Sequence, residues 1–157
     1  MKDDQTRAWD LMSAIDYCML VTQAGDGLHA RPMSSIVKPD EGKIYFLSDA
    51  SSTKDEEIAN NPDILLAYSN GSSKFVSAMA SASASHDRAL IDRLWNPGAQ
   101  AFWPKGPSDP SVIAIIAVPT HAQFWDGSNA AVSTVRFAIA LMTGTKPDPG
   151  ETAKVVL

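Results

Sequence analysis

Two short segments of the chain combine a cation with polar donors, which is the chemistry that binds an anion. The first is Ala30-Arg31-Pro32-Met33-Ser34, inside a predicted strand. Proline removes a hydrogen-bond donor from a strand, so it belongs at an edge or a bulge where backbone groups are available to a ligand. The guanidinium of Arg31 could then bind a phosphate or a carboxylate. An edge strand protected by Pro32, with Arg31 in solvent, explains these residues at least as well.

The second segment is Ser51-Ser52-Thr53-Lys54, which precedes a predicted short helix. Hydroxyls, a cation and the free N–H groups of a helix start together make an anion site. Taken alone, however, the segment is better explained by ordinary N-capping, because Thr53 and Glu56 have the spacing of a capping box. The acidic residues at 55–57 would also repel a phosphate.

Aromatic residues and the absence of catalytic motifs narrow the chemistry further. Indole rings can cover a planar ligand, although in a chain of this length they are more often core or dimer-interface anchors. The three histidines have no metal-ligand spacing, so no metal site is predicted. Cys18 lies in an apolar run and is expected to be inert. No nucleophile elbow, Walker loop or dinucleotide fingerprint occurs, so the catalytic residues stay unassigned. The aromatic residues in question are Trp95, Phe102, Trp103, Phe124 and Trp125.

The elements that must position these residues are mainly strands. Hairpin signals such as Gly25-Asp26-Gly27 join short apolar runs, without the crossover helices of a parallel sheet. We therefore predict a mainly β chain, an antiparallel barrel of about six strands with peripheral helices, forming a single domain over residues 1–157. Strands are expected at 17–22, 28–37, 43–48, 64–68, 75–83, 112–118 and 122–125, with a bulge or edge at Pro119. Helices are expected around 8–15, 53–61, 87–95 and 132–143, and an irregular stretch at 97–110.

Composition excludes several classes of function. The chain has 157 residues, 45% hydrophobic and 20% charged, with 18 acidic against 13 basic residues and a formal charge of −5. Without a basic stripe, binding to nucleic acid or to an anionic membrane is disfavoured. The longest apolar run, Val112 to Val118, is too short to cross a bilayer, and the N-terminus is unlike a signal peptide. A cytoplasmic protein is expected.

Together, and in this order, these segments resemble the FMN-binding split-barrel family related to pyridoxamine 5′-phosphate oxidase, and within it the general stress protein 26 group. The resemblance covers nearly the whole chain. The segments that carry it are Arg31-Pro-Met, Ile44-Tyr-Phe-Leu-Ser48, Ser51-Ser-Thr-Lys54, Asn60-Asn-Pro62, Asp87-Arg88, Leu94-Trp95-Asn96, Phe102-Trp-Pro-Lys-Gly106, Phe124-Trp-Asp126 and Thr143-Gly-Thr-Lys-Pro-Asp-Pro-Gly150.

The resemblance implies a six-stranded antiparallel split β-barrel that forms a homodimer with an FMN at each of two interface sites. Arg31 and Lys54 would hold the FMN phosphate together with Ser52 and Thr53. Trp125 of the partner subunit would close the site, with Trp103 nearby. The isoalloxazine ring would be lined by the backbone around two runs of residues: Pro32, Met33 and Ser34, and Phe46, Leu47 and Ser48.

The chain also departs from the family. Ala80-Ser81-Ala82 stands where the fifth strand often has glycine before alanine, and the Arg-x-His that the true oxidases use near their C-terminus is missing. We therefore predict an FMN-dependent oxidoreductase that takes a hydride from reduced nicotinamide, with an unknown acceptor, and not a pyridoxamine 5′-phosphate oxidase. Two alternatives stay open: a non-catalytic stress protein that binds or senses flavin, and a barrel that has lost its cofactor and acts only as a dimer.

Overall fold

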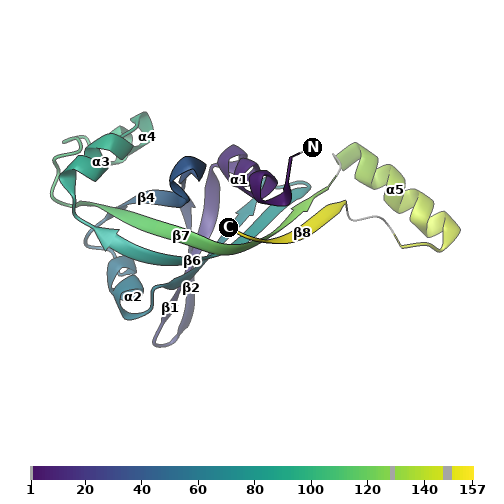
Figure 1. Cartoon of the computed structure of the whole chain (residues 1–157), viewed down its shortest axis with the longest axis horizontal. Coiled ribbons are helices and arrows are strands. Elements are labelled where there is room, and N and C mark those ends of the chain that lie inside the picture. Colours follow the sequence, from purple (N-terminus) through teal and green to yellow (C-terminus); the bar gives the residue numbers. More distant parts are fainter. Residues whose placement is uncertain (1, 128–129, 147–149) are drawn as a thin grey trace.

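The chain folds around one antiparallel sheet that curves into an open barrel (Figure 1). The computed structural model describes residues 2–127, 130–146 and 150–157. Within these residues the sheet has eight strands in the order β2-β1-β5-β6-β7-β4-β3, and β8 pairs with the second half of β7. The strands are β1 (Tyr17–Ala24), β2 (Gly27–Ser34), β3 (Ile36–Lys38), β4 (Lys43–Asp49), β5 (Asp63–Ser69), β6 (Lys74–Ser85), β7 (Val112–Asp126) and β8 (Glu151–Val156).

Helices lie at the ends and edges of the sheet, as the sequence predicts. They are α1 (Asp4–Ile15), α2 (Lys54–Asn60), α3 (Arg88–Leu94), α4 (Pro97–Phe102) and α5 (Ala130–Thr143), with a 3₁₀ turn at Pro39–Glu41. The prediction of an irregular stretch at 97–110 is wrong for residues 97–102, which form α4. This helix is capped by Asn96, whose side chain accepts a hydrogen bond from the backbone N–H of Ala99 at 3.0 Å. No described helix is both long and apolar enough to cross a membrane.

The predicted fold class, a mainly β split barrel, is confirmed, and the strand count differs for local reasons. The strand expected at 28–37 is broken at Ser35, whose N–H and hydroxyl both bond to the carbonyl of Asp16 at 2.8 Å. The two strands expected at 112–118 and 122–125 form the single strand β7, which carries the expected irregularity next to Pro119. The strand β8 was not predicted.

The barrel interior holds the main core. Strand alternation turns Leu20, Phe46, Leu66, Val76 and Phe124 inward, all of them at most 1% exposed. The apolar stripe of α1 covers one end of this core through residues such as Ala8 and Met12. A smaller cluster packs α3 on the other side of β4 and β7, through Tyr45, Ile91, Leu94, Val112 and Ala114.

The opposite face of the sheet is open to solvent and partly apolar. We call it the outer sheet face; it is marked by the exposed side chains of Met19, Phe75, Met79, Val118 and Val156. A hollow of about 310 Å³ lies on it, lined by residues of β6, β7 and β8. The small side chains of β6 alternate here between the core and this face.

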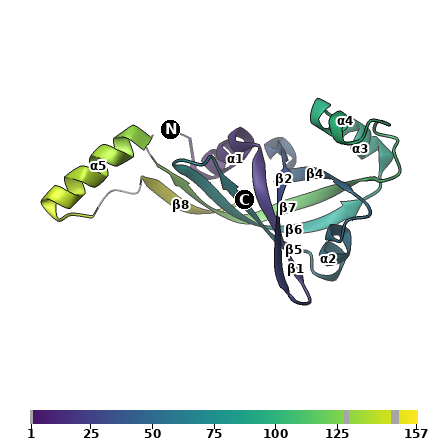
Figure 2. The same cartoon turned by 180° about the vertical axis from the view of Figure 1, so that it is seen from behind.

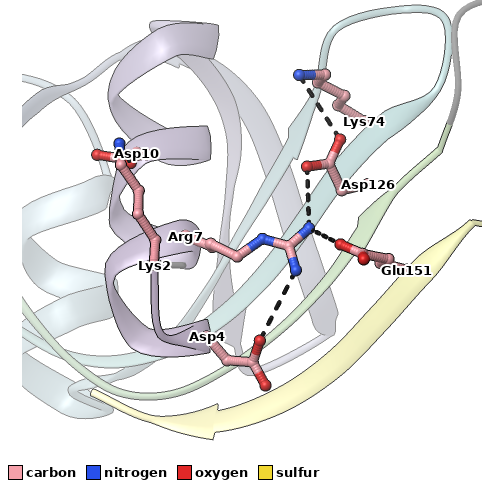
Figure 3. Close-up of polar contacts among 7 residues, drawn as sticks. All are labelled: Lys2, Asp4, Arg7, Asp10, Lys74, Asp126 and Glu151. Carbon is pink, nitrogen blue, oxygen red and sulfur yellow. Dashed lines mark hydrogen bonds and ion pairs between the residues drawn. The ribbon is translucent and has the colours of Figure 1, made fainter.

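Ion pairs tie α1 to the point where the chain leaves β7 and enters β8 (Figure 3). Arg7 contacts Asp126 at 3.3 Å, contacts Glu151, and lies 3.9 Å from Asp4. Its guanidinium also lies over the ring of Phe124, 5.1 Å from the centroid. From this end of the sheet α5 stands away from the barrel, and Figure 2 shows the same arrangement from behind.

Candidate functional site

A cavity of about 320 Å³ lies at the seam of the barrel, where β2 and β4 approach each other without pairing. We call it the seam pocket. Its volume is within the range of small-molecule sites. Seven of the residues predicted to bind a cofactor line it: Pro32, Met33 and Ser34 from β2, Leu47 and Ser48 from β4, Lys54 at the start of α2, and Trp103 after α4.

Two serine hydroxyls close to this pocket are buried without a hydrogen-bond partner among the described residues. They are Ser48 Oγ, which lines the pocket, and Ser52 Oγ, two residues before Lys54. Leaving a polar group buried and unsatisfied costs about 1–3 kcal/mol, so such atoms mark places where a ligand or water would bond. Both serines belong to the predicted site.

Lys54 supplies a positive charge close to this pocket, with the carboxylates of Asp49, Asp55 and Glu57 near enough to favour its charged form. No ion pair or hydrogen bond of its ammonium group is found within the described part of the chain. Burial lowers the pKa of Lys54, and the neighbouring charge of Arg31 lowers it further. An anion bound in the seam pocket would offset both effects, since an opposite charge favours the charged form of an amine.

Arg31 is engaged in a different way, in a cluster that joins β1, β2 and α2. Its Nη2 donates to Glu57 Oε2 at 2.7 Å, and its Nη1 donates to Thr22 Oγ1 at 2.5 Å. Thr22 also donates to Glu57, and His29 Nδ1 lies 2.8 Å from Glu57 Oε1. The alternative of a solvated Arg31 is wrong, because its side chain is only 20% exposed. Arg31 borders the site without lining the pocket.

The sequence indicated only that Glu57 would repel a phosphate, and not that it joins this cluster. Burial opposes its ionisation, but hydrogen bonds from Thr22, His29 and Arg31 outweigh burial and lower the pKa of the carboxyl to about 2. The bond to Glu57 also raises the pKa of His29. The available signal was spacing: Lys54 and Glu57 are three residues apart, which places them on one side of a helix.

The capping interpretation of the Ser51–Lys54 segment is also wrong. Thr53 has helical dihedral angles, φ −67° and ψ −8°, and its side chain makes no capping hydrogen bond. The hydroxyl is exposed next to Lys54. The helix therefore does not use the polar groups that the segment offers, which favours the anion interpretation.

Trp103 and Trp125, the two predicted aromatic contacts, lie at opposite ends of the molecule. Trp103 lines the seam pocket, with its ring centroid 6.3 Å from Trp95 and 6.0 Å from Phe102. Trp125 is near the far end of β7, whereas Ser48 pairs with Ile113 near its start. At about 3.3 Å per residue these points are about 40 Å apart along the strand, so Trp125 cannot reach the pocket of its own chain.

Other predicted residues lie beside the pocket, and some pocket residues were not predicted. Phe46 is fully buried in the core, so only its backbone could face a ligand, as the resemblance implies. The wall formed by α4 was missed, although Asn96-Pro97 is a recognised helix-start signal. The lining residues that sequence reasoning did not assign are Tyr17, Ile36, Asp49, Asn96, Gly98, Ala99 and Phe102.

An open antiparallel barrel with a pocket at its seam is the FMN-binding split-barrel class of fold. The chain belongs to the pyridoxamine 5′-phosphate oxidase like family, whose model matches residues 3–148. No curated protein matches the chain.

Solved structures of similar chains agree with this family. A protein assigned as a general stress protein 26 from Jannaschia sp. CCS1 is 26% identical, with 98% of each chain covered and a TM-score of 0.77. A general stress family protein from Xanthomonas campestris is 29% identical over 82% of this chain and 92% of that one, with a TM-score of 0.71. A general stress FMN/FAD binding protein from Xanthomonas citri is 29% identical over 80% and 89%, with a TM-score of 0.70.

Proposed function

We propose that this chain binds FMN in the seam pocket and acts as a flavin-dependent oxidoreductase, as a homodimer with two such sites. The observation that supports the cofactor is that, among the described residues, the ammonium of Lys54 and the buried hydroxyls of Ser48 and Ser52 all lack a hydrogen-bond partner. The FMN/FAD binding of the similar protein from Xanthomonas citri supports the same cofactor.

The donors around Lys54 suit a phosphate monoester. Such a group carries a charge of about −1.5 to −2 at neutral pH and has three acceptor oxygens. Lys54 and Arg31 supply two cations, and Ser52 and Thr53 supply hydroxyl donors. The guanidinium of Arg31 has five N–H groups, of which Thr22 and Glu57 accept two in the described structure. Arg31 therefore has donors left for a phosphate while Glu57 holds it in place.

The rest of the pocket suits a flat ring with polar edges. Met33, Leu47, Phe102 and Trp103 offer apolar surface, and the backbone of β2 and β4 offers hydrogen-bonding groups at the seam where these strands do not pair. When bound, FMN would supply the hydride and electron transfer. The residues of this chain would bind the phosphate, orient the ring and exclude water from it.

The proposed reaction needs no acid or base from the protein. Among the side chains that line the seam pocket, only Tyr17, Asp49 and Lys54 ionise. Lys54 is assigned to the phosphate, and Asp49 accepts bonds from the N–H and hydroxyl of Ser51 at 2.8 and 2.6 Å. Reduced nicotinamide is the proposed hydride donor. The small number of ionisable side chains in the pocket equally favours the alternative, a flavin-binding protein without turnover.

The resemblance implies that Trp125 of a partner subunit closes the site, and the distance between Trp125 and the seam pocket of its own chain agrees with such a homodimer. A tryptophan about 40 Å away along β7 can cover this pocket only from a second copy. The exposed apolar side chains of the outer sheet face provide a surface for that copy. A cytoplasmic location is part of the proposal and is supported by Cys18, the single cysteine of the chain, being a buried free thiol.

The absorbance spectrum of the purified protein tests the function. FMN is expected to remain bound, or to bind on addition, and to bleach when reduced nicotinamide is added without oxygen. Riboflavin, which lacks the phosphate, should bind far more weakly. Bleaching no faster than that of free FMN would leave the flavin-binding alternative. A protein that takes up no FMN would contradict the proposal.

A further inference from the structure

Helix α5 carries large apolar side chains on opposite sides, and both sides are exposed. Val135, Ile139 and Met142 form one apolar stripe and are 59%, 54% and 88% exposed. Phe137 and Leu141 point the other way, one turn apart, and are 56% and 73% exposed. A helix that is apolar all round is normally buried. Both sides of α5 that these five side chains mark are open to solvent, although Ala140 of the same helix is buried.

The place from which α5 extends is fixed. Arg7 links Asp126 at the end of β7 to Glu151 at the start of β8 (Figure 3). Gly150 has φ +89°, and a Cβ there would lie 2.6 Å from the Cα of Gly127. The two backbones therefore approach each other closely at the base of the segment. The chain thus leaves β7 and enters β8 at one defined point of the sheet.

A second copy of the chain is the occupant that the exposed area favours. Large apolar side chains at these exposures present roughly 500 Å² on α5, and the outer sheet face adds roughly 400 Å². The sum is close to the 800 Å² that each partner buries in a standard interface, and above the largest apolar patch of a typical monomer. A membrane surface fits less well, because α5 carries one cation, Arg136, and the chain has a net charge of −5.

Helix α5 and the seam pocket lie at opposite ends of the molecule (Figures 1 and 2). Figures 1 and 2 both place α5 at one end and the helices α3 and α4, beside the seam pocket, at the other. A two-fold axis through the outer sheet face exchanges these ends between copies. It brings α5 and Trp125 to the partner's seam pocket, whose rim exposes Tyr17 (64%) and Phe102 (81%).

We propose that α5 is an exchanged arm: in the dimer it packs on the other copy, against the rim formed by Tyr17 and Phe102, and closes that copy's seam pocket. This rests on the dimer of the proposed function, and does not require FMN. The site is then incomplete in one chain, and the apolar surface of α5 serves as its lid.

Charged substitutions on α5 test the arm in cofactor-free protein. The double variant Phe137→Glu, Leu141→Lys keeps the net charge and adds a Glu-to-Lys pair at i, i+4, which supports the helix. In a monomer both side chains would meet only water. With the exchanged arm, the dimer dissociation constant in sedimentation should rise about 100-fold or more, as for interface anchors. The matched control, Leu28→Glu, replaces another exposed leucine at the tip of the β1–β2 hairpin and should leave the dimer intact.

Cross-linking tests where the arm packs. Cys18 is buried and burial raises its pKa to about 12, so it stays unreactive at neutral pH. Chains carrying Leu141→Cys are mixed with chains carrying Phe102→Cys, allowed to exchange subunits and treated with a flexible bismaleimide. A product of twice the chain mass is expected in the mixture and in neither single variant alone. Cross-linking within one chain of the double-cysteine variant, without the product in the mixture, would overturn the arm.

The outcomes separate the arm from the proposed function. If the wild-type protein is a dimer but does not bind FMN, the proposed cofactor is wrong and the proposed arm is unaffected. A dimer unaffected by the α5 substitutions contradicts the arm, while FMN binding stands. Binding of wild-type protein to phosphatidylcholine–phosphatidylglycerol vesicles that is lost in the α5 variant would also contradict the arm, because the helix would then face lipid.

Discussion

The guanidinium of Arg31 is held by the buried carboxylate of Glu57, with 2.7 Å between Nη2 and Oε2. Lys54, one turn earlier on the same helix as Glu57, has no such partner among the described residues. The two cations of the proposed phosphate site therefore differ in what they do for the folded protein. Arg31 helps to join α2 to the β1–β2 hairpin, whereas Lys54 is left for a ligand. Substitutions of the two residues should differ accordingly.

Replacing Lys54 should weaken FMN binding without destabilising the fold. In Lys54→Ala a charge-assisted bond to the phosphate is lost, which is expected to cost about 1.5–3 kcal/mol of binding free energy. Thermal unfolding of the cofactor-free variant should match wild type, because no described ion pair is removed. Fluorescence titration with FMN measures the affinity, and Lys54→Arg should restore most of it. Equal affinities of the wild type and Lys54→Ala for FMN would remove Lys54 from the site.

Replacing Arg31 should lower stability as well as affinity. Arg31→Ala leaves Glu57 as a buried carboxylate without its permanent cation, and breaking a buried pair costs about 3 kcal/mol or more. Unfolding in urea should show this loss in cofactor-free protein. In the double variant Arg31→Ala, Glu57→Gln much of the stability should return, because the uncompensated charge is gone. If the double variant is no more stable than Arg31→Ala, the ion pair is not what stabilises this cluster.

The sequence predicted most elements because their signals are local. The stripe of α1, the hairpin at Gly25–Gly27 and the capping of α3 by Asp87 depend on residues close in the chain. Strand β8 was missed because it is stabilised by pairing with β7, and its own residues show no distinct alternation. The exposed stripe of α5 was visible as periodicity, but periodicity does not say whether a helix packs on its own chain.

The sequence indicated which segments meet at the candidate site, but not which charged residues pair there. The residues Pro32–Ser34, Leu47, Ser48 and Lys54, which the resemblance implies as FMN contacts, line one cavity. Their assignment as FMN ligands stays a prediction. The partnership of Arg31 with Glu57 could not be foreseen, since it depends on how α2 docks against β1 and β2. Local propensity also favoured a cap at Thr53 that the loop geometry does not form.

The stability of the protein should depend on pH both below and above the slightly acidic range, because of the cluster that Glu57 forms with Arg31, Thr22 and His29. The pKa of Glu57 is lowered from 4.5 to about 2, so its contribution is present above pH 4.5 and lost as pH falls toward 2. The pKa of His29 is raised above 6.5, chiefly by its bond to Glu57, with Asp26 adding to the effect and Arg31 opposing it. Its contribution is therefore present below pH 6.5 and lost as pH rises through the raised value.

Urea unfolding at a series of pH values checks this dependence. Wild type should lose stability on going from pH 6 to pH 8 more than His29→Gln does, because the variant has no imidazole to titrate. Glu57→Gln should reduce the loss at the acidic side. Parallel curves for wild type and His29→Gln between pH 6 and 8 would show that His29 does not contribute through its charge.

No significant oxidation of pyridoxine or pyridoxamine 5′-phosphate is expected, although the chain belongs to the pyridoxamine 5′-phosphate oxidase like family. Such a substrate brings a second phosphate, which needs cations beyond Arg31 and Lys54. Arg88 donates to the backbone carbonyls of residues 107, 109 and 112, and Arg93 pairs with Glu41 at 2.6 Å. Both are thus engaged in holding α3 to the barrel.

The assay is formation of pyridoxal 5′-phosphate with FMN saturating and oxygen present. The expected result is no turnover above that of free FMN, while reduced nicotinamide still bleaches the bound flavin. Turnover of about 1 per second or more would contradict the prediction.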